Sequence, residues 1–523
     1  MSKACARRLL LFVLWAGGTF GGGIADRAGA ASIGTSANVP ATPPDLHSFQ
    51  QPSLAANPDR SGELAIAYQD GGQLQSCGLS LSTDGGRAWR ARDLIGGEGR
   101  FALPGGESLC WNPVVAYGSP GVLYYAFQAS TSEFDSRILT VVSDDGGRTF
   151  EPPRAVASAG ESLPGGGDWY PRIAVDPGSG RVYVAWIRFG PPPHFEAVLL
   201  IASSTDLGRT FTRPTPVPTS AQGAPPGALE SLAVAAGPQG RVSVAWMDVT
   251  EWRESCLHAR ADCNSPGRLE VATSSDGAVR FTPARTVAGA VSLGCASMSR
   301  PHCDAEHGSG LSGLESMAAG PSGNLFTAWF QPVGGHNRVR FSSSPDGGRS
   351  WTPARTVAPA GSSGDDQFRP VVSVAPGGRV DLAFYDRTPT GMQDVYWTWS
   401  TDGGESFTPP IRVTDRPSDG AVGPPDLFFG DAARVSFGDR LGMTSQEGSA
   451  VIAWTDSRRG DPDNAKQDIY VARASISRGT RHGLLFALVV GGGAIGLGAA
   501  ALVLRRRRRR LAISTGGAGP QAG

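Results

Sequence analysis

Short apolar runs recur along the chain from about residue 60 to about residue 475, separated by Gly, Pro, Asp and Asn. In the clearest copy, runs at 172–175 and 182–187 flank the turn DPGSG, and a third run follows at 198–203. Each run has the length of a β-strand and is too short for a helix. Seven equivalent second runs are present: ELAIAY, VLYYAF, VYVAWI, RVSVAW, NLFTAW, RVDLAF and AVIAW. Many are apolar at consecutive positions, which is typical of sheets covered on both faces.

A second pattern, S-x-D-x-G-x-x-(W/F), occurs six times, with Ala278 in place of the glycine in the fourth copy. In such a turn the Asp carboxylate accepts backbone N–H groups of its own loop, and the glycines supply positive φ. The closing aromatic packs under the hairpin, so the pattern predicts structural turns and no catalytic role. Its aspartates are Asp84, Asp145, Asp206, Asp276, Asp346 and Asp402.

Together the two patterns predict an all-β fold, a β-propeller of four-stranded antiparallel blades over residues 36–477. The seven second strands favour seven blades, and the six turn motifs leave six as the alternative. The last copy, 450–454 with 468–476, lacks the motif and a fourth strand. Residues 36–50 are expected to supply that strand and close the ring, which would remove the exposed edges.

Both ends of the chain carry membrane-related signals. Residues 1–30 resemble a secretory signal peptide, with basic residues before a short apolar run; an uncleaved signal anchor is the alternative. The 22 residues 483–504 carry no charge and are followed by six arginines, which predicts one C-terminal transmembrane helix. The Arg-rich tail, 505–523, is then cytoplasmic. We expect a single-pass protein of the cell membrane with its propeller outside the cell. Lysine occurs only at Lys3 and Lys466, a composition typical of a GC-rich bacterial genome.

The net charge of zero hides an acidic ectodomain. Setting aside residues 1–30 and the six tail arginines lowers Lys+Arg from 47 to 37 and Asp+Glu from 47 to 46. A nucleic-acid partner, which needs clustered cations, is therefore not expected. No cofactor is expected either.

Six cysteines lie in the exported part, and their even number outside the cell suggests disulfides. Pairing of near neighbours is the preferred choice among 15 connectivities. A metal site that combines the last four cysteines with neighbouring histidines is the alternative, but its spacing matches no standard zinc pattern. The preferred pairs are Cys77–Cys110, Cys256–Cys263 and Cys295–Cys303.

The repeated S-x-D-x-G-x-x-W motif, across roughly residues 45–477, resembles the Asp-box (BNR-repeat) β-propellers of the sialidase (neuraminidase) superfamily. In that family the boxes lie on the face away from the active site. The resemblance implies a glycoside hydrolysis in which three arginines grip a sugar carboxylate. An Asp is the acid/base, and a Tyr activated by a Glu is the nucleophile.

The resemblance also suggests site residues. The segment QFRPVV is similar to the family's F-R-I-P motif without its Ile and lies in the sixth repeat, whereas the family's motif opens the first. Two Glu-Ser strands lack the arginine that should follow and have Trp246 or Trp329 there. A water-filled channel along the axis would also make first-strand residues polar. The candidates are Arg172, Arg340 and Arg369 for the clamp, Asp168 or Asp366 as acid, Tyr170 as nucleophile, and Glu230 or Glu315 as base.

Three functions follow from these observations. Because the arginine set is incomplete, recognition of glycans or envelope partners through the axial face is preferred. Removal of terminal acidic sugars by an exo-α-sialidase is the alternative. A membrane-held scaffold is the third interpretation.

Overall fold

The computed structural model describes most of residues 32–477. Its compact unit spans Gly34–Ser475, and a second unit combines Met1–Ile33 with Ile476–Gly523. The predicted signal peptide and the predicted helix at 483–504 lie outside the described residues. Within the described ranges, no helix is long and apolar enough to cross a membrane. The described residues are 32–44, 47–71, 76–96, 101, 103, 106–132, 135–157, 166–191, 197–219, 229–248, 266–292, 314–334, 336–358, 366–426, 431–435, 437, 440–461 and 463–477.

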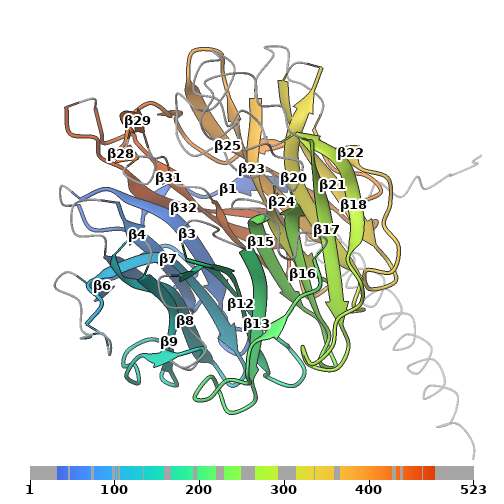
Figure 1. The fold of residues 1–523 in the computed structure, drawn as a ribbon. Coiled ribbons are helices and arrows are strands. Elements are labelled where there is room, and N and C mark those ends of the chain that lie inside the picture. Colours follow the sequence, from blue (N-terminus) through green and yellow to red (C-terminus); the bar gives the residue numbers. More distant parts are fainter. Residues whose placement is uncertain are drawn as a thin grey trace, which may run out of the picture. The chain divides into compact units, whose positions relative to one another are not determined.

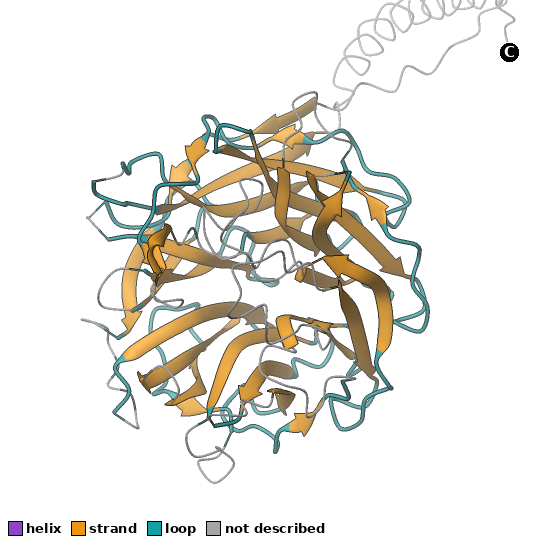
Figure 2. Cartoon of the chain, turned by 45° about the horizontal axis from the view of Figure 1, so that its top comes forward, coloured by secondary structure: helices purple, strands orange, loops and turns teal. Residues whose placement is uncertain are grey.

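Seven antiparallel sheets follow one another along the chain as the blades of a propeller (Figures 1 and 2), and the seven-blade prediction is confirmed. Blades 1 to 3 are β3(Phe49–Ala56)–β4(Leu64–Asp70)–β5(Cys77–Ser82)–β6(Arg90–Ile95), β7(Leu109–Gly118)–β8(Val122–Ser132)–β9(Asp135–Ser143)–β10(Arg154–Ala155) and β11(Gly167–Val175)–β12(Val182–Phe189)–β13(Ala197–Ser204)–β14(Thr215–Pro216). Blades 4 and 5 are β15(Leu229–Ala236)–β16(Val242–Asp248)–β17(Pro266–Ser274)–β18(Arg285–Ser292) and β19(Leu314–Ala319)–β20(Leu325–Val333)–β21(His336–Ser344)–β22(Arg355–Thr356). Blade 6 is β23(Asp366–Val374)–β24(Val380–Arg387)–β25(Met392–Ser400)–β26(Ile411–Arg412), with β27(Ser418–Asp419) also paired to β25. Blade 7 is β30(Gly442–Gln446)–β31(Ser449–Asp456)–β32(Asp468–Ser477), and β28(Pro425–Asp426) pairs with β29(Asp431–Val435) as a separate hairpin.

The N-terminal segment closes the ring, as predicted. Strands β1(Ser32–Thr35) and β2(Val39–Pro40) both pair with β32 and complete blade 7. The backbone N–H of Ala41 donates to the carbonyl of Ile469 at 2.7 Å, and that of Ser36 to Arg473 at 2.8 Å. The closing segment starts four residues earlier than expected, because β1 precedes residue 36. The first and last parts of the ring are therefore held by backbone hydrogen bonds.

Apolar side chains fill the spaces between neighbouring blades. One cluster joins blades 1 and 2 through Leu79, Tyr125 and Val141, and another joins blades 7 and 1 through Val451 and Ile66. The second strands contribute the largest side chains and are buried on both faces, in agreement with their continuous apolar pattern. Fully buried tryptophans are Trp186, Trp246, Trp329, Trp397 and Trp454.

The six S-x-D-x-G turns share one hydrogen-bond pattern. The Ser hydroxyl donates to the Asp Oδ1 at 2.6–2.9 Å and accepts the N–H of the residue at the glycine position at 2.7–3.1 Å. The same Asp Oδ1 accepts the N–H four residues further on at 2.9–3.0 Å. Ala278 keeps this turn at a φ of 72°, a conformation that costs energy for any residue except glycine.

Arginines from neighbouring blades bind the carbonyls of several of these turns. Arg473 of blade 7 donates to Gly85 O of blade 1 at 3.2 Å, and Arg181 of blade 3 donates to Gly277 O of blade 4 at 3.3 Å. From the fourth strands, Arg92 of blade 1 donates to the carbonyl of Gly147 in blade 2, and Arg355 of blade 5 donates to that of Glu405 in blade 6. The turns therefore connect blades as well as closing hairpins.

A disulfide joins Cys77 of β5 to Cys110 of β7, with a Cα–Cα distance of 5.7 Å, which confirms the first predicted pair. It links the third strand of blade 1 to the first strand of blade 2. Both cysteines are fully buried. The other predicted pairs, and the alternative metal site, lie outside the described residues.

The Cys77→Ala/Cys110→Ala variant should lose about 3–4 kcal/mol of unfolding free energy, because the bridge closes a loop of 33 residues in the unfolded chain. Urea unfolding with and without reductant measures this change. An unchanged midpoint in the variant would contradict the expectation.

Hydrogen bonds in the turns should make stability depend on acid pH. Slight desolvation disfavours the charged form of Asp346, but hydrogen bonds from Ser350, Ser344 and Arg349 outweigh it and lower the pKa to about 2 from 3.8. This contribution is complete above pH 4 and disappears as the pH falls through 2. Asp346→Asn should therefore cost no more than about 1 kcal/mol at pH 7, since the group is exposed, and much less at pH 2, where about half of the carboxyl groups are protonated. Urea midpoints from pH 2 to 7 test this, with Asp144→Asn as the charge-matched control; a difference at pH 2 as large as that at pH 7 would refute it.

Candidate functional site

The two ends of the propeller axis differ. In blades 1 and 4 the turn after the first strand contacts the S-x-D-x-G turn of the same blade, through Gly85 N–H to Gly62 O and Gly277 N–H to Gly240 O, both at 3.0 Å. The starts of the first strands therefore lie at the opposite end, which we call the axial mouth. First strands of consecutive blades pack against each other, so their starts surround the axis.

A repeated β-bulge shapes the axial mouth. In blades 1 to 6 the pairing of the first strand with the second shifts register near the start of the first strand. In five of these blades one residue of the bulge has a positive φ of 47–59°. In each case this residue lies two positions before the first-strand residue that pairs with an alanine of the second strand. The five residues are Gln51, Asn112, Tyr170, Ser231 and Arg369. Arg440 occupies the matching position of blade 7, because Gly442 pairs with Ala453. A bulge residue is not paired in the ladder, so its side chain can be directed toward the axis.

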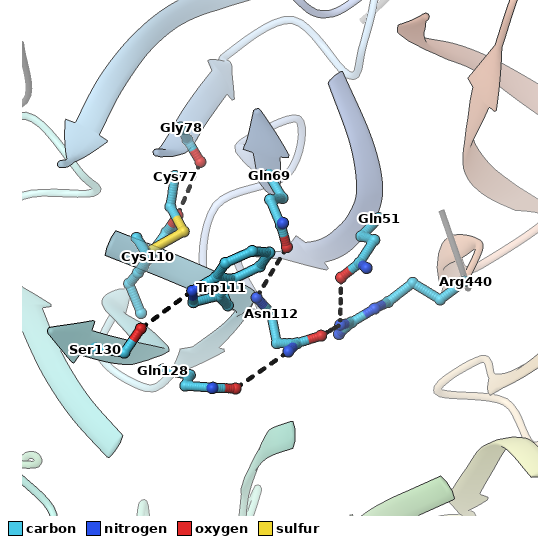
Figure 3. Close-up of a disulfide and its surroundings, with 11 residues drawn as sticks. Gln51, Gln69, Cys77, Gly78, Cys110, Trp111, Asn112, Gln128, Ser130 and Arg440 are labelled. Atoms are coloured by element: carbon cyan, nitrogen blue, oxygen red, sulfur yellow. Dashed lines mark hydrogen bonds between the residues drawn. A yellow bond between two sulfur atoms is a disulfide. The ribbon is translucent and has the colours of Figure 1, made fainter. Parts of the chain in front are cut away.

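Arg440 connects three blades at this mouth (Figure 3). Its Nη2 donates to Gln51 Oε1 at 3.1 Å and to Asn112 Oδ1 at 3.3 Å. Asn112 in turn donates from Nδ2 to Gln128 Oε1 at 3.2 Å and from its backbone N–H to Gln69 Oε1 at 3.1 Å. These five residues, which we call the amide–arginine cluster, place a guanidinium and four amide side chains on blades 7, 1 and 2.

Two further guanidinium groups lie on blade 6, around Phe368. The Arg369 Cζ is 5.6 Å and the Arg387 Cζ 5.3 Å from the centre of the Phe368 ring, which stacks on Tyr385 at 5.3 Å. Burial lowers the pKa of Arg387 to about 10, so it stays charged at neutral pH. Blades 6 and 7 thus give the mouth three arginines that are at most 9% exposed.

The predicted acid Asp168 has a structural partner. Arg188 of β12 holds it with two bonds, Nε to Oδ1 at 2.6 Å and Nη2 to Oδ2 at 2.8 Å, and both groups are buried. The second candidate, Asp366, accepts the N–H of Asn337 at 2.8 Å and lies 4.0 Å from Arg387. Asp168 therefore has a structural role as the buried partner of Arg188.

The three predicted arginines lie on three different blades. Arg340 lies on β21, and its guanidinium donates at 2.7 Å to Thr356 Oγ1 and to Ala354 O, at the outermost strand of blade 5. Arg172 is half-buried on β11 and donates to Pro171 O at 3.0 Å. Arg369 alone of the three occupies a bulge position.

The remaining candidates are placed only in part. Tyr170 occupies the bulge position of blade 3, and its ring centre is 6.0 Å from that of Trp169. Glu230 and Glu315 lie in β15 and β19, but their side chains are outside what the structure describes. Asp168, Tyr170 and Arg172 are therefore close in sequence on one strand of blade 3, three blades away from Arg369 on blade 6.

Sequence reasoning missed the amide–arginine cluster, although a signal for its position was present. Four first strands carry a proline directly after the bulge residue, in the pairs Gln51–Pro52, Asn112–Pro113, Tyr170–Pro171 and Arg369–Pro370. The F-R-P segment is thus one copy of a repeated x-Pro bulge. Arg440, followed by Leu441, carries no such signal.

Comparisons with known proteins identify similar folds. Neither a protein-family model nor a curated protein matches this sequence. Among solved structures, the Hadza microbial sialidase Hz136 is 16% identical, with a TM-score of 0.42, covering 79% of this chain and 74% of its own. A polysaccharide lyase PL25 ulvan lyase is 12% identical, with a TM-score of 0.48 and coverages of 83% and 94%. The Penicillium chrysogenum α-L-arabinanase is 12% identical, with a TM-score of 0.43 and coverages of 84% and 98%. No residue role follows from likeness at this level.

The ion pair between Asp168 and Arg188 can be tested by a double-mutant cycle. Arg188→Met should cost about 3–5 kcal/mol of unfolding free energy, because it leaves a buried carboxylate without its cation. Asp168→Asn combined with Arg188→Met should recover most of that loss, as measured by urea unfolding at pH 7. Additive costs would instead show that the two groups act independently.

Proposed function

We propose that this chain is a membrane-anchored propeller on the outside of the cell that binds glycans at its axial mouth. The amide–arginine cluster is the observation that carries this proposal. Amide groups donate and accept hydrogen bonds, and a guanidinium pairs with a carboxylate, so together they suit hydroxyl-rich and acidic ligands. The anchor rests on the uncharged segment 483–504 and the six arginines after it.

The environment of the candidate acids favours binding over catalysis. Hydrolysis of a glycoside needs a carboxyl group that can donate its proton to the leaving oxygen. Asp168 is engaged by Arg188 through both oxygens, and Asp366 is fixed by a backbone N–H. Both oxygens of Asp168 are thus engaged, and one oxygen of Asp366.

Exo-α-sialidase activity is the second candidate. Arg369, Arg387 and Arg440 give the mouth three buried cations on neighbouring blades, which favours an acidic sugar as ligand. This set differs from the one expected from the sequence, since it replaces Arg172 and Arg340.

Binding can be measured with the full chain in detergent, using sialyllactose and lactose as probes. Arg440→Gln should weaken sialyllactose binding at least tenfold, roughly the loss of one charge-assisted hydrogen bond. Arg379→Gln is the matched control. It removes a similarly buried arginine that bonds to Asp381, Gln446 O and Ser449 O at the opposite end of the axis, and should leave binding unchanged.

The same preparations should be tested with a fluorogenic sialoside. Binding without hydrolysis supports the proposed function, and hydrolysis that Arg440→Gln abolishes would support the sialidase instead. Failure of wild type to bind either sugar or to cleave the sialoside would overturn both.

A further inference from the structure

The outer strand of blade 4 differs from those of the other blades. Strand β18, Arg285–Ser292, has eight residues, whereas β10, β14, β22 and β26 have two each. Strand β6 has six residues, but three of them are the charged residues Arg90, Arg92 and Asp93. After Arg285, β18 has no charged residue and no proline.

Among the described residues, no strand covers the outer side of β18. In the part of the chain that the structure describes, β18 is the last strand of its sheet and pairs only with β17. Thr286 and Gly289 are exposed, and a Cβ added to Gly289 would meet no atom within 4 Å. Proteins usually protect such edges with charges, prolines, bulges or very short strands, because a free edge pairs readily with another strand. After Arg285, β18 has only the bulges in its pairing with β17.

The sequence of this edge is complementary to itself. Residues 287–291 read V-A-G-A-V, which is the same in both directions, and Thr286 and Ser292 flank them. In an antiparallel pair centred on Gly289, Val faces Val, Ala faces Ala, and Thr faces Ser. Cross-strand pairs of β-branched residues and of hydroxyl residues stabilise a sheet.

We propose that two copies of this chain pair antiparallel through residues 286–292 of β18, with Gly289 at the two-fold axis. An antiparallel pair of identical strands has two-fold symmetry, so each contact forms twice and the interface is closed. Two register shifts in the β17–β18 pairing leave extra residues on β18, which increases its twist. Both copies carry the same bulges, so the pairing keeps its two-fold symmetry. The two sheets join into one of eight strands across the interface.

The partner is a second copy and not an unrelated peptide because the register that aligns V-A-G-A-V with itself also pairs the flanking hydroxyls. The axial mouth is formed by the first strands, at the opposite edge of each blade from β18. Dimer formation is therefore independent of the proposed glycan binding, and either can fail alone.

Introducing a charge at Gly289 tests the pairing. The measurement is sedimentation velocity of the full chain in detergent. Gly289→Lys and Gly289→Glu each place like charges opposite one another at the two-fold axis, and each should raise the dimer dissociation constant at least tenfold. Mixing the two variants should restore a dimer. Gly34→Lys, at another glycine with open space around it, is the control and should remain dimeric.

A cross-link locates the interface. Gly289→Cys should form an intermolecular disulfide at the two-fold axis under mild oxidation, and Gly34→Cys should not. Monomeric wild type would overturn the proposal. So would a dimer that persists in Gly289→Lys without a Gly289→Cys cross-link, since association would then come from elsewhere, such as the predicted membrane helix.

Discussion

Closure of the ring by backbone pairing is the constraint on which the rest of this structure depends. Seven sheets can bury both faces only if the last packs against the first, and blade 7 has only three strands of its own before β1 and β2 join β32. The bonds from Ala41 and Ser36 to β32 connect segments more than 400 residues apart in the sequence. The amide–arginine cluster depends on the same closure, because Arg440 of blade 7 reaches Gln51 of blade 1.

The arginines at the opposite end of the axis strengthen this closure. Arg473 links blade 7 to blade 1 through Gly85 O, and Arg92 links blade 1 to blade 2 through Gly147. A turn that satisfies its own N–H groups through Ser and Asp leaves its carbonyls available to a neighbouring blade. The S-x-D-x-G motif therefore stabilises the hairpin internally and the ring externally.

The sequence alone was sufficient to predict features that repeat along the chain. It was insufficient to predict features that arise from contacts between distant segments. The second strands, the Cys77–Cys110 pair and the closing segment follow from periodicity, spacing and the need to cover edges. The positions of the candidate site residues do not follow in this way. Arg340 resembles a clamp residue in the sequence, but its guanidinium donates to Ala354 O in the outer part of blade 5. Arg440 looks unremarkable in the sequence, because its role depends on Gln51 and Asn112 in distant segments.

The x-Pro bulge has a consequence for how this protein can diversify. The first residue of the bulge is outside the ladder, and in four blades a proline follows it. Its backbone conformation therefore does not depend on its own side chain. Gln51, Asn112, Tyr170, Ser231 and Arg369 show that amide, phenol, hydroxyl and guanidinium are all accepted there. Natural variants of this propeller can therefore change the groups displayed at the axial mouth one blade at a time, while the architecture that presents those groups stays the same.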